Sequence, residues 1–339
     1  MKKMRNKAKK ILSIKGLSVE YRTSDGVVKA LNGLDLEVGH GQSHGLVGET
    51  GAGKTTTGLA VMGLVPDPPG VITAGEILFD GSELLKLNEK ELERIRGKQA
   101  SMIFQDPMTS LNPVLTVESQ IAEVIQLHEY ISKEAALEKA HKMLETVGIP
   151  ASRGKEYPHQ FSGGMKQRVV IAIALSCNPL LLIADEPTTA LDVTIQAQVL
   201  DKMMEIRREY GTSMLMITHD LGVIAETCDM VSIIYAGHVV EHGTVEDIFD
   251  HNLHPYTQGL FDSLPDLNNR RAKLKPIKGL MPDPTNLPEG CAFWPRCNHA
   301  MDICGKCKPE RRYRNDTHYV ECHLYDGGDM IESKVRAHG

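Results

Sequence analysis

Short apolar runs rich in β-branched residues alternate along this chain with longer segments in which apolar residues recur at helical spacing. Runs of the first kind are typical of buried strands, and the longer segments are typical of amphipathic helices. This alternation predicts an α/β fold whose sheet is mostly covered on both faces. The predicted strands are residues 11–21, 43–47, 75–79, 99–104, 180–184, 213–217 and 231–235. The predicted helices are residues 54–64, 117–128, 133–147, 163–176, 195–210 and 221–227.

Two changes along the chain predict its domain organisation. The paired helices at 117–128 and 133–147 form an all-helical insertion between strands, so we expect a helical subdomain at about 106–178 inside a domain spanning 11–251. Near residue 252 the sequence becomes charged and proline-punctuated, which predicts a small second domain over 252–339. Its apolar content is thin, so this domain needs a staple such as a metal to hold its fold.

Composition narrows the class of protein. The chain has 339 residues, 41% of them hydrophobic and 24% charged, which is typical of a soluble globular protein. Its net charge of -6 gives no reason to expect nucleic acid as a partner. The longest uncharged run, 169–184, is too short and too polar to cross a bilayer, so any membrane role is peripheral. The basic N-terminus lacks the apolar region of a signal peptide, which predicts a cytoplasmic protein.

Residues 48–55 read GETGAGKT and match the phosphate-binding loop GxxxxGK(S/T) between a predicted strand and a predicted helix. Its glycines let successive backbone N–H groups face the phosphates at a helix N-terminus, whose dipole also favours anions. We expect Lys54 to reach the β and γ phosphates and Thr55 to bind Mg²⁺. The predicted nucleotide-binding residues here are Gly48, Glu49, Thr50, Gly51, Ala52, Gly53, Lys54, Thr55 and Thr56.

A second chemical signal is LLIADEP at residues 181–187, where a buried strand ends in two carboxylates. Ligands of open α/β sheets bind at this end of the strands. We expect Asp185 to hold Mg²⁺ directly or through water. Glu186 is the predicted catalytic carboxylate that orients and polarises the attacking water.

Three further motifs complete a recognisable set: FSGGMKQR at residues 161–168, TALD ending at Asp192, and MITHD containing His219. Together with Gln105 after SMIF, the set resembles the nucleotide-binding subunit of ABC (ATP-binding cassette) transporters over residues 11 to about 249. The resemblance implies an ABC-type P-loop NTPase core with a helical subdomain, followed here by the small Cys-rich domain.

This resemblance also assigns roles to residues. It implies that Gln105 is the Q-loop glutamine, which contacts Mg²⁺ and the attacking water, and that His219 is the switch histidine. Asp192 corresponds to the D-loop aspartate, and Tyr21 to the aromatic residue that stacks on adenine. Ser162, Gly163 and Gly164 correspond to the signature motif, which opens a helix and thus offers a second positive helix end to a γ phosphate.

The resemblance implies that two chains stack head to tail, so that each signature motif closes the ATP of its partner. Phe161 and Met165 depart from the commonest signature, which carries leucine and glutamine there. With QDPMTSLNP at 105–113 and HPYT at 254–257, they resemble the dipeptide and oligopeptide permease ATPases. Nickel and glutathione importers share much of this pattern and stay open as alternatives.

The subfamily implies a set of partners and a location. We expect two transmembrane permease subunits, a paralogous or identical ATPase subunit and, indirectly, an extracytoplasmic peptide-binding protein. The chain would then lie on the cytoplasmic face of the cell membrane and couple ATP hydrolysis to peptide uptake. Two rival functions fit the sequence less well. A soluble cassette ATPase usually carries two cassettes or a coiled coil, and a metal-sensing module without turnover would lack Glu186 or His219.

Cysteines crowd residues 291–322. Cys291, Cys297, Cys304 and Cys322 have wide, irregular spacing that fits neither zinc-ribbon nor C2H2 patterns. Four thiolates suit a 4Fe-4S cluster, which takes one cysteine per iron, and the resemblance implies such a cluster in some dipeptide permease ATPases. Cys307 is an extra thiol that could replace Cys304. Zn²⁺ and reduced thiols without metal stay open as alternatives.

Overall fold

The structure, a computed structural model, describes residues 10–189, 191–264 and 275–327. Its larger sheet has the strand order β11–β12–β10–β9–β3–β8–β7–β6. The smaller sheet has the order β2–β1–β4–β5 and is antiparallel. The strands of the larger sheet are β3 (Ser43–Val47), β6 (Ala100–Ile103), β7 (Leu181–Asp185), β8 (Ser213–Thr218), β9 (Met230–Tyr235), β10 (His238–Thr244), β11 (Arg311–Tyr313) and β12 (Tyr319–Glu321). Those of the smaller sheet are β1 (Lys10–Thr23), β2 (Gly26–Gly39), β4 (Gly70–Phe79) and β5 (Ser82–Glu83).

The parallel half of the larger sheet positions the candidate site. Strands β6, β7, β8, β3 and β9 run parallel to one another, so their carboxyl ends lie along one edge. All five residues of β3 and of β7 are buried, which explains why β7 is apolar up to its last residue. In β3 the buried polar residue His44 is hydrogen-bonded to Ser232 of β9. The phosphate loop follows β3, Gln105 follows β6, the acidic pair closes β7 and His219 follows β8. The fold therefore gathers residues that are far apart in the sequence.

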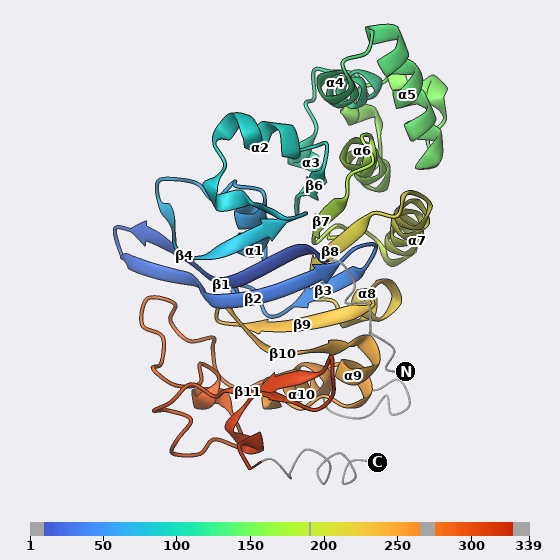
Figure 1. Cartoon of the computed structure of the whole chain (residues 1–339). Helices are drawn as coiled ribbons and strands as arrows, with labels where there is room; N and C mark the ends of the chain where they lie inside the picture. Colours follow the sequence, from blue (N-terminus) through green and yellow to red (C-terminus); the bar gives the residue numbers. More distant parts are fainter. Residues whose placement is uncertain (1–9, 190, 265–274, 328–339) are drawn as a thin grey trace, which may run out of the picture.

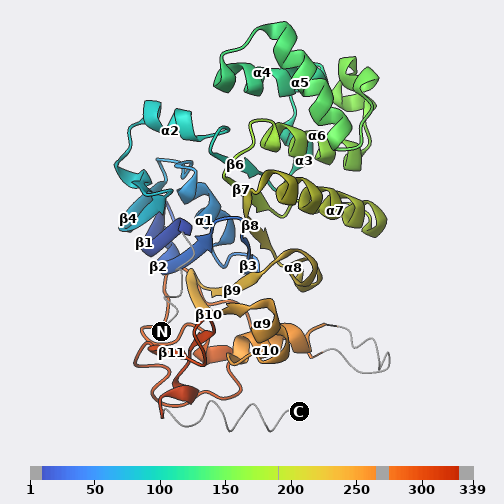
Figure 2. The ribbon, with the colours of Figure 1, turned by 45° about the vertical axis from the view of Figure 1, so that its right-hand side comes forward.

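The helices occupy different parts of the molecule in Figures 1 and 2. Helices α4, α5 and α6 lie together at the top of both views, whereas α1 lies beside the sheets and α9 and α10 lie below β10. One large core cluster extends from the upper helices to the larger sheet, and a second lies between the two sheets around α1. The helices are α1 (Lys54–Val61), α2 (Glu89–Ile95), α3 (Pro107–Ser110), α4 (Val117–Glu129), α5 (Lys133–Thr146), α6 (Gly163–Leu175), α7 (Val193–Tyr210), α8 (Leu221–Thr227), α9 (Val245–Asp250) and α10 (Pro255–Asp262).

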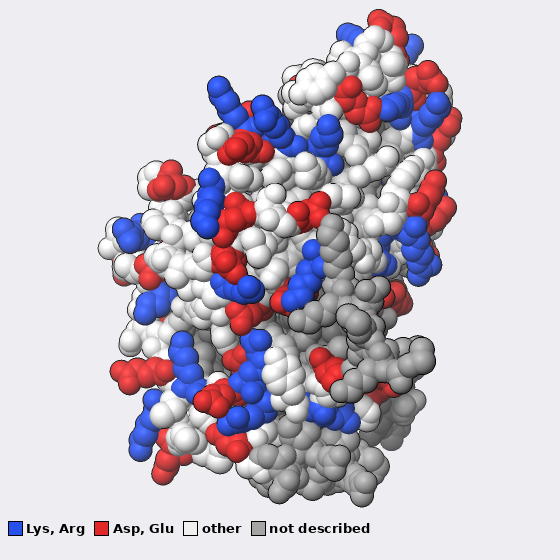
Figure 3. Space-filling model, viewed as in Figure 1, with Lys and Arg blue, Asp and Glu red and all other residues white. Residues whose placement is uncertain are grey.

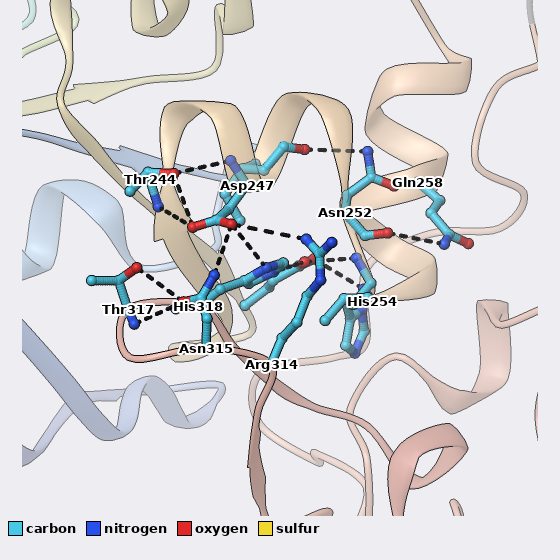
Figure 4. Close-up of polar contacts among 12 residues, drawn as sticks. Thr244, Asp247, Asn252, His254, Gln258, Arg314, Asn315, Thr317 and His318 are labelled. Carbon is cyan, nitrogen blue, oxygen red and sulfur yellow. Dashed lines mark hydrogen bonds and ion pairs between the residues drawn. The ribbon is translucent and has the colours of Figure 1, made fainter. Parts of the chain in front are cut away.

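The C-terminal segment is joined to the larger sheet, because β12 pairs with β10 and β11 pairs with β12. A buried polar network reinforces this junction (Figure 4). His318 lies between two carboxylates, 2.9 Å from Glu241 and 3.6 Å from Asp247. Glu241 is fully buried and also accepts hydrogen bonds from the backbone N–H groups of Leu253 and His254. These contacts offset the free-energy cost of burying the Glu241 carboxylate, and they attach the C-terminal segment to the start of α10.

The α/β class and the helical group are confirmed, and each predicted strand and helix overlaps an observed one. The predictions missed β2, β5, β10, β11, β12, α2, α3, α9 and α10. Strand β2 escapes the pattern because its buried and exposed positions alternate imperfectly, with shifts of register against β1. In the described ranges, no helix is both long and apolar enough to span a bilayer. On the face drawn in Figure 3, positive and negative side chains are interspersed.

Candidate active site

The phosphate loop connects β3 to α1, and two of its glycines are required by close contacts. A Cβ at Gly48 would lie 2.3 Å from the carbonyl oxygen of Ile234. Gly53 has a φ of +102°, and a Cβ there would lie 2.6 Å from the carbonyl oxygen of Ala30. Both positions therefore exclude side chains, one by space alone and the other also by its left-handed backbone.

Lys54 is the first residue of α1, and its ammonium group is directed at the phosphate loop. The Nζ atom donates to the carbonyl oxygens of Gly48 at 2.6 Å and Glu49 at 3.0 Å. Burial lowers the pKa of Lys54, and the nearby carboxylates of Glu186 and Asp185 oppose this shift. The ammonium group of Lys54 is thus held against two carbonyl oxygens of the phosphate loop.

Asp185 closes β7 and is only 2% exposed. The Thr55 side chain hydrogen-bonds to its carboxylate, and in the described part of the chain the Oδ1 atom has no hydrogen-bond partner. Burial raises the pKa of Asp185, and the Thr55 contact lowers it only in part. A buried carboxylate with a free oxygen beside a hydroxyl is a donor set that suits Mg²⁺. These two residues therefore fit the ion that the sequence predicts.

The Glu186 carboxylate contacts the other two predicted catalytic residues. Nδ1 of His219 lies 2.9 Å from Oε1 of Glu186, and Nε2 of Gln105 donates to Oε2 at 3.1 Å. Thr189 donates to the same Oε2 at 3.0 Å. Thr189 was missed by the sequence analysis, although its place three residues after Glu186 is a usable signal. The structure thus brings Gln105, Glu186 and His219 together beside the phosphate loop.

The environment of Glu186 keeps its carboxylate ionised. Burial opposes ionisation, but the hydrogen bonds from His219 and Thr189 outweigh it, and the pKa of Glu186 lies below its ordinary value. Its backbone has a φ of 47°, unusual for a residue with a side chain, and its N–H donates to the carbonyl of Ile217 in β8. An ionised carboxylate held this way can polarise a water molecule.

Tyr21 lies near the end of β1, and its hydroxyl is 3.4 Å from that of Thr56 in α1. This contact places the tyrosine next to the helix that begins at the phosphate loop. The hydroxyl contact thus links the end of β1 to the first turn of α1.

The signature residues and Asp192 lie at helix starts. Ser162 caps α6 by accepting from the Met165 N–H, and Asp192 caps α7 by accepting from the Ile195 N–H. A Cβ at Gly164 would lie 2.3 Å from the Ile195 side chain, so this glycine permits close packing of α6 on α7. Within the described ranges, no hydrogen bond joins these residues to the phosphate loop of the same chain.

The four cysteines Cys291, Cys297, Cys304 and Cys322, here called the four-cysteine site, line one small cavity, and Cys307 is exposed outside it. Each of the four sulfurs accepts a backbone N–H. Burial raises the pKa of Cys291 to about 11 and that of Cys322 to about 12. As they stand in the described structure, these side chains form no group arranged to hold a metal ion.

Known proteins match the chain along almost its whole length. Residues 31–189 match the family described as ABC transporter, and residues 240–304 match the C-terminal region of oligopeptide/dipeptide transporters. The oligopeptide transport ATP-binding protein OppD of Bacillus subtilis is 50% identical, covering 93% of this chain and 89% of the relative. The dipeptide transport ATP-binding protein DppD of the same organism is 49% identical, covering 94% of this chain and 95% of the relative.

The chain belongs to the ATP-binding proteins of ABC peptide transporters. OppD of Escherichia coli is also similar, at 48% identity over 88% of this chain and 89% of its own. Among solved structures, the dimeric ATP-binding cassette MJ0796 bound to ADP and Pi is 26% identical. Its TM-score is 0.62, covering 69% of this chain and 98% of that cassette. As a member of this family, the present chain is an ATPase, and its ligands are ATP and Mg²⁺.

Proposed function

We propose that this ATPase is the energy-supplying subunit of an importer that takes up dipeptides or oligopeptides through separate membrane subunits. The observation that carries the ATPase role is the convergence of His219, Gln105 and Thr189 on the Glu186 carboxylate, next to the phosphate loop. The peptide substrate is supported by the similarity to OppD and DppD and by the matching C-terminal region. Nickel and glutathione remain the alternative cargoes.

In this proposal each residue has the role that its position allows. Backbone N–H groups of residues 48–53 and the start of α1 bind the phosphates, with Lys54 moving from the loop carbonyls to the β and γ phosphates. Asp185 and Thr55 hold Mg²⁺, with Gln105 contacting the ion and the attacking water. Ionised Glu186 polarises that water, while His219 fixes Glu186 and stabilises charge on the γ phosphate. Tyr21 stacks on adenine.

The signature motif serves the nucleotide of a second ATPase subunit in this proposal. Ser162, Gly163 and Gly164 open a helix of 13 residues, which offers its N-terminus to a γ phosphate. Asp192 lies at the subunit contact, at the start of α7. The partner is a paralogous or identical subunit, and the solved cassette that is similar to this chain is itself described as dimeric.

Residues 11–251 form the nucleotide-binding domain in our proposal, with the helical subdomain at about 106–178 receiving the two permease subunits. Residues 252–339 form the C-terminal domain, of which residues 265–274 and 328–339 lie outside the described ranges. The protein would bind peripherally to the cytoplasmic face of the membrane. An extracytoplasmic peptide-binding protein would deliver the cargo to the permeases.

Uptake by the assembled transporter tests this function. The chain is co-expressed with two permease subunits and a paralogous ATPase subunit, and the complex is reconstituted with a peptide-binding protein. ATP-dependent accumulation of a labelled dipeptide or hexapeptide is expected, and it should stop when Glu186→Gln is combined with the equivalent change in the second ATPase. Accumulation of nickel or glutathione in place of peptide would overturn the substrate assignment, and uptake by the doubly disabled complex would overturn the ATPase role.

We also propose that the four-cysteine site holds a 4Fe-4S cluster, with Zn²⁺ as the alternative. Two observations support this proposal: all four cysteines line one cavity, and the sulfur of each accepts a backbone N–H, a contact that stabilises cluster thiolates. The raised pKa values of Cys291 and Cys322 mean that loading must displace protons. The cluster would act as a structural staple for the C-terminal domain.

Anaerobic purification tests the cluster. Brown protein with about four iron and four sulfide per chain is expected, as for a cluster bound by four thiolates. Cys304→Ser should lose most of this iron, whereas the matched variant Cys307→Ser should keep it, because Cys307 lies outside the cavity. Colourless protein with zinc bound would favour the alternative, and full iron content in Cys304→Ser would disprove the ligand set.

A further inference from the structure

The side chain of Glu49 in the phosphate loop is bound by an arginine from the C-terminal segment. Arg296 donates from Nη1 to Oε2 of Glu49 at 2.6 Å and from Nη2 to Oε1 at 3.1 Å. The Arg296 side chain is only 6% exposed. Two parallel, charge-assisted bonds of this kind fix orientation as well as distance. A residue nearly 250 positions later in the chain thus determines where the Glu49 carboxylate lies.

The backbone of Glu49 is held as well. Its N–H donates to the hydroxyl of Tyr256 at 2.9 Å, and its carbonyl accepts from Lys54 at 3.0 Å and from the N–H of Ala52 at 3.1 Å. Tyr256 belongs to α10 and is fully buried. Glu49 therefore has its carboxylate, its amide and its carbonyl engaged at once, and two of these contacts come from the chain beyond residue 251.

Arg296 is itself rigidly placed. Its Nε donates to the carbonyl of Lys278 at 3.0 Å, and its Nη1 lies 3.3 Å from the Tyr235 hydroxyl. The guanidinium lies 5.9 Å from the ring centres of both Tyr235 and Phe293. The hydrogen bond to Glu49 is the main cause that raises the pKa of Arg296 above its ordinary value. Because its partners are backbone and aromatic groups on several elements, this arginine cannot easily follow Glu49 if the loop moves.

Tyr256, which is the other contact to Glu49, belongs to the same aromatic cluster. Its ring packs edge-on against Tyr235 at 4.6 Å and lies 5.4 Å from Phe293. The cluster therefore joins β9, α10 and the segment that carries Arg296 into one support beneath the phosphate loop. The motif HPYT at 254–257 thus contributes Tyr256 to this cluster.

We propose that Arg296 and Tyr256 are positioning residues for the nucleotide site, acting through Glu49. They hold the phosphate loop in its binding conformation, which lowers the ordering cost of nucleotide binding. Arg296 also neutralises a carboxylate on the loop that receives a polyanion, and without it that charge would repel the phosphates. The C-terminal segment is then part of the nucleotide site of its own chain. This inference rests on the proposed nucleotide site and adds two residues to it.

Nucleotide affinity tests the proposal on the full-length chain. Arg296→Met keeps a similar length and loses the charge, and we expect it to bind Mg-ATP about tenfold more weakly, equivalent to about 1.4 kcal/mol. The rate at saturating ATP should change far less, because neither residue contacts the reacting atoms. Arg312→Met is the matched control, since Arg312 pairs with Glu310 and Asp326 away from the loop and should leave affinity unchanged.

A double variant separates positioning from a general loss of stability. Glu49→Gln removes the carboxylate charge and should cost less affinity than Arg296→Met. Glu49→Gln combined with Arg296→Met should bind Mg-ATP more tightly than Arg296→Met alone, because no unpaired charge remains on the loop. A purely structural role of Arg296 would leave the double variant no better than the single one, and that result would overturn the proposal.

Tyr256→Phe is a second test variant, which removes only the hydroxyl and keeps the ring and its aromatic packing. We expect about a threefold loss of Mg-ATP affinity from the missing hydroxyl, within the usual range for one hydrogen bond. Affinities of Arg296→Met and Tyr256→Phe equal to the wild type would disprove the inference and leave the proposed function intact. A wild-type chain that itself failed to bind Mg-ATP would instead disprove the proposed function.

Discussion

The imidazole of His219 lies 2.9 Å from the Glu186 carboxylate, which also receives the side chains of Gln105 and Thr189. These partners come from the ends of β6, β7 and β8, which are consecutive strands of the larger sheet. One carboxylate is thus oriented by side chains from three strand ends. This arrangement stabilises the ionised form and aims it, which are the two properties that a water-polarising group needs.

Glu186→Gln should remove hydrolysis and keep ATP binding. The amide retains the shape of the side chain but cannot accept a proton or carry the charge, so we expect a loss of about a hundredfold or more in rate. Single-turnover hydrolysis and nucleotide affinity are the measurements. Lys54→Ala is the comparison and should weaken both binding and turnover. A Glu186→Gln protein that hydrolyses ATP at the wild-type rate would contradict the assignment.

His219→Ala should shift the pH profile as well as reduce the rate. His219 lowers the pKa of Glu186, so ionised Glu186 is present at neutral pH and is lost only as the pH falls through its depressed pKa. Without the histidine the pKa of Glu186 rises, and the acidic limb of the rate profile should move to higher pH. Profiles of the two proteins at saturating ATP test this. An unmoved limb would show that His219 does not tune Glu186.

Asp185→Asn should weaken Mg²⁺ binding. The amide keeps one oxygen but removes the charge that attracts the cation, so hydrolysis should need about tenfold more Mg²⁺, equivalent to about 1.4 kcal/mol. A titration of ATPase rate against free Mg²⁺ measures this, and chelation of the ion should abolish wild-type turnover. An unchanged Mg²⁺ requirement would remove Asp185 from the site.

Gly164→Ala should destabilise the protein, whereas Gly163→Ala should not. A methyl group at Gly164 would lie 2.3 Å from the Ile195 side chain, but at Gly163 its closest neighbour would be Leu191 at 3.9 Å. We expect a loss of about 1–3 kcal/mol in the free energy of unfolding for Gly164→Ala, typical of overpacking. Denaturant unfolding of both variants gives the answer. Equal free energies of unfolding for the two variants would contradict the tight packing of α6 on α7 at Gly164.

Acidification should destabilise the fold through His242. Burial lowers the pKa of His242 from 6.5 to about 4, so the unfolded chain binds protons more readily between these values. Stability is therefore full above pH 6.5 and falls as the pH drops toward 4, by about 2 kcal/mol between pH 7 and pH 5. His242→Gln should lose about 2 kcal/mol less over that interval, with the exposed His159→Gln as control. Parallel pH curves for all three proteins would contradict this origin.

The sequence by itself determined the α/β class, the phosphate loop, the acidic pair and the family. These are local signals: glycine spacing, strand-length apolar runs and short motifs each report the conformation or chemistry of neighbouring residues. The elements it missed, such as β2 and β10, have patterns broken by register shifts or by polar residues whose partners are distant. Their identity depends on which strand they pair with, and periodicity does not carry that information.

Only the tertiary structure decided how distant residues combine. The parallel strand order brings Gln105 and His219 to Glu186, and the pairing of β12 with β10 returns the C-terminal segment to the nucleotide site, where Arg296 binds Glu49. No local pattern marks Arg296, because its importance lies in a contact made across the fold. Motifs reveal which groups can bind phosphate or polarise water, but long-range packing fixes their partners, their charge state and their orientation.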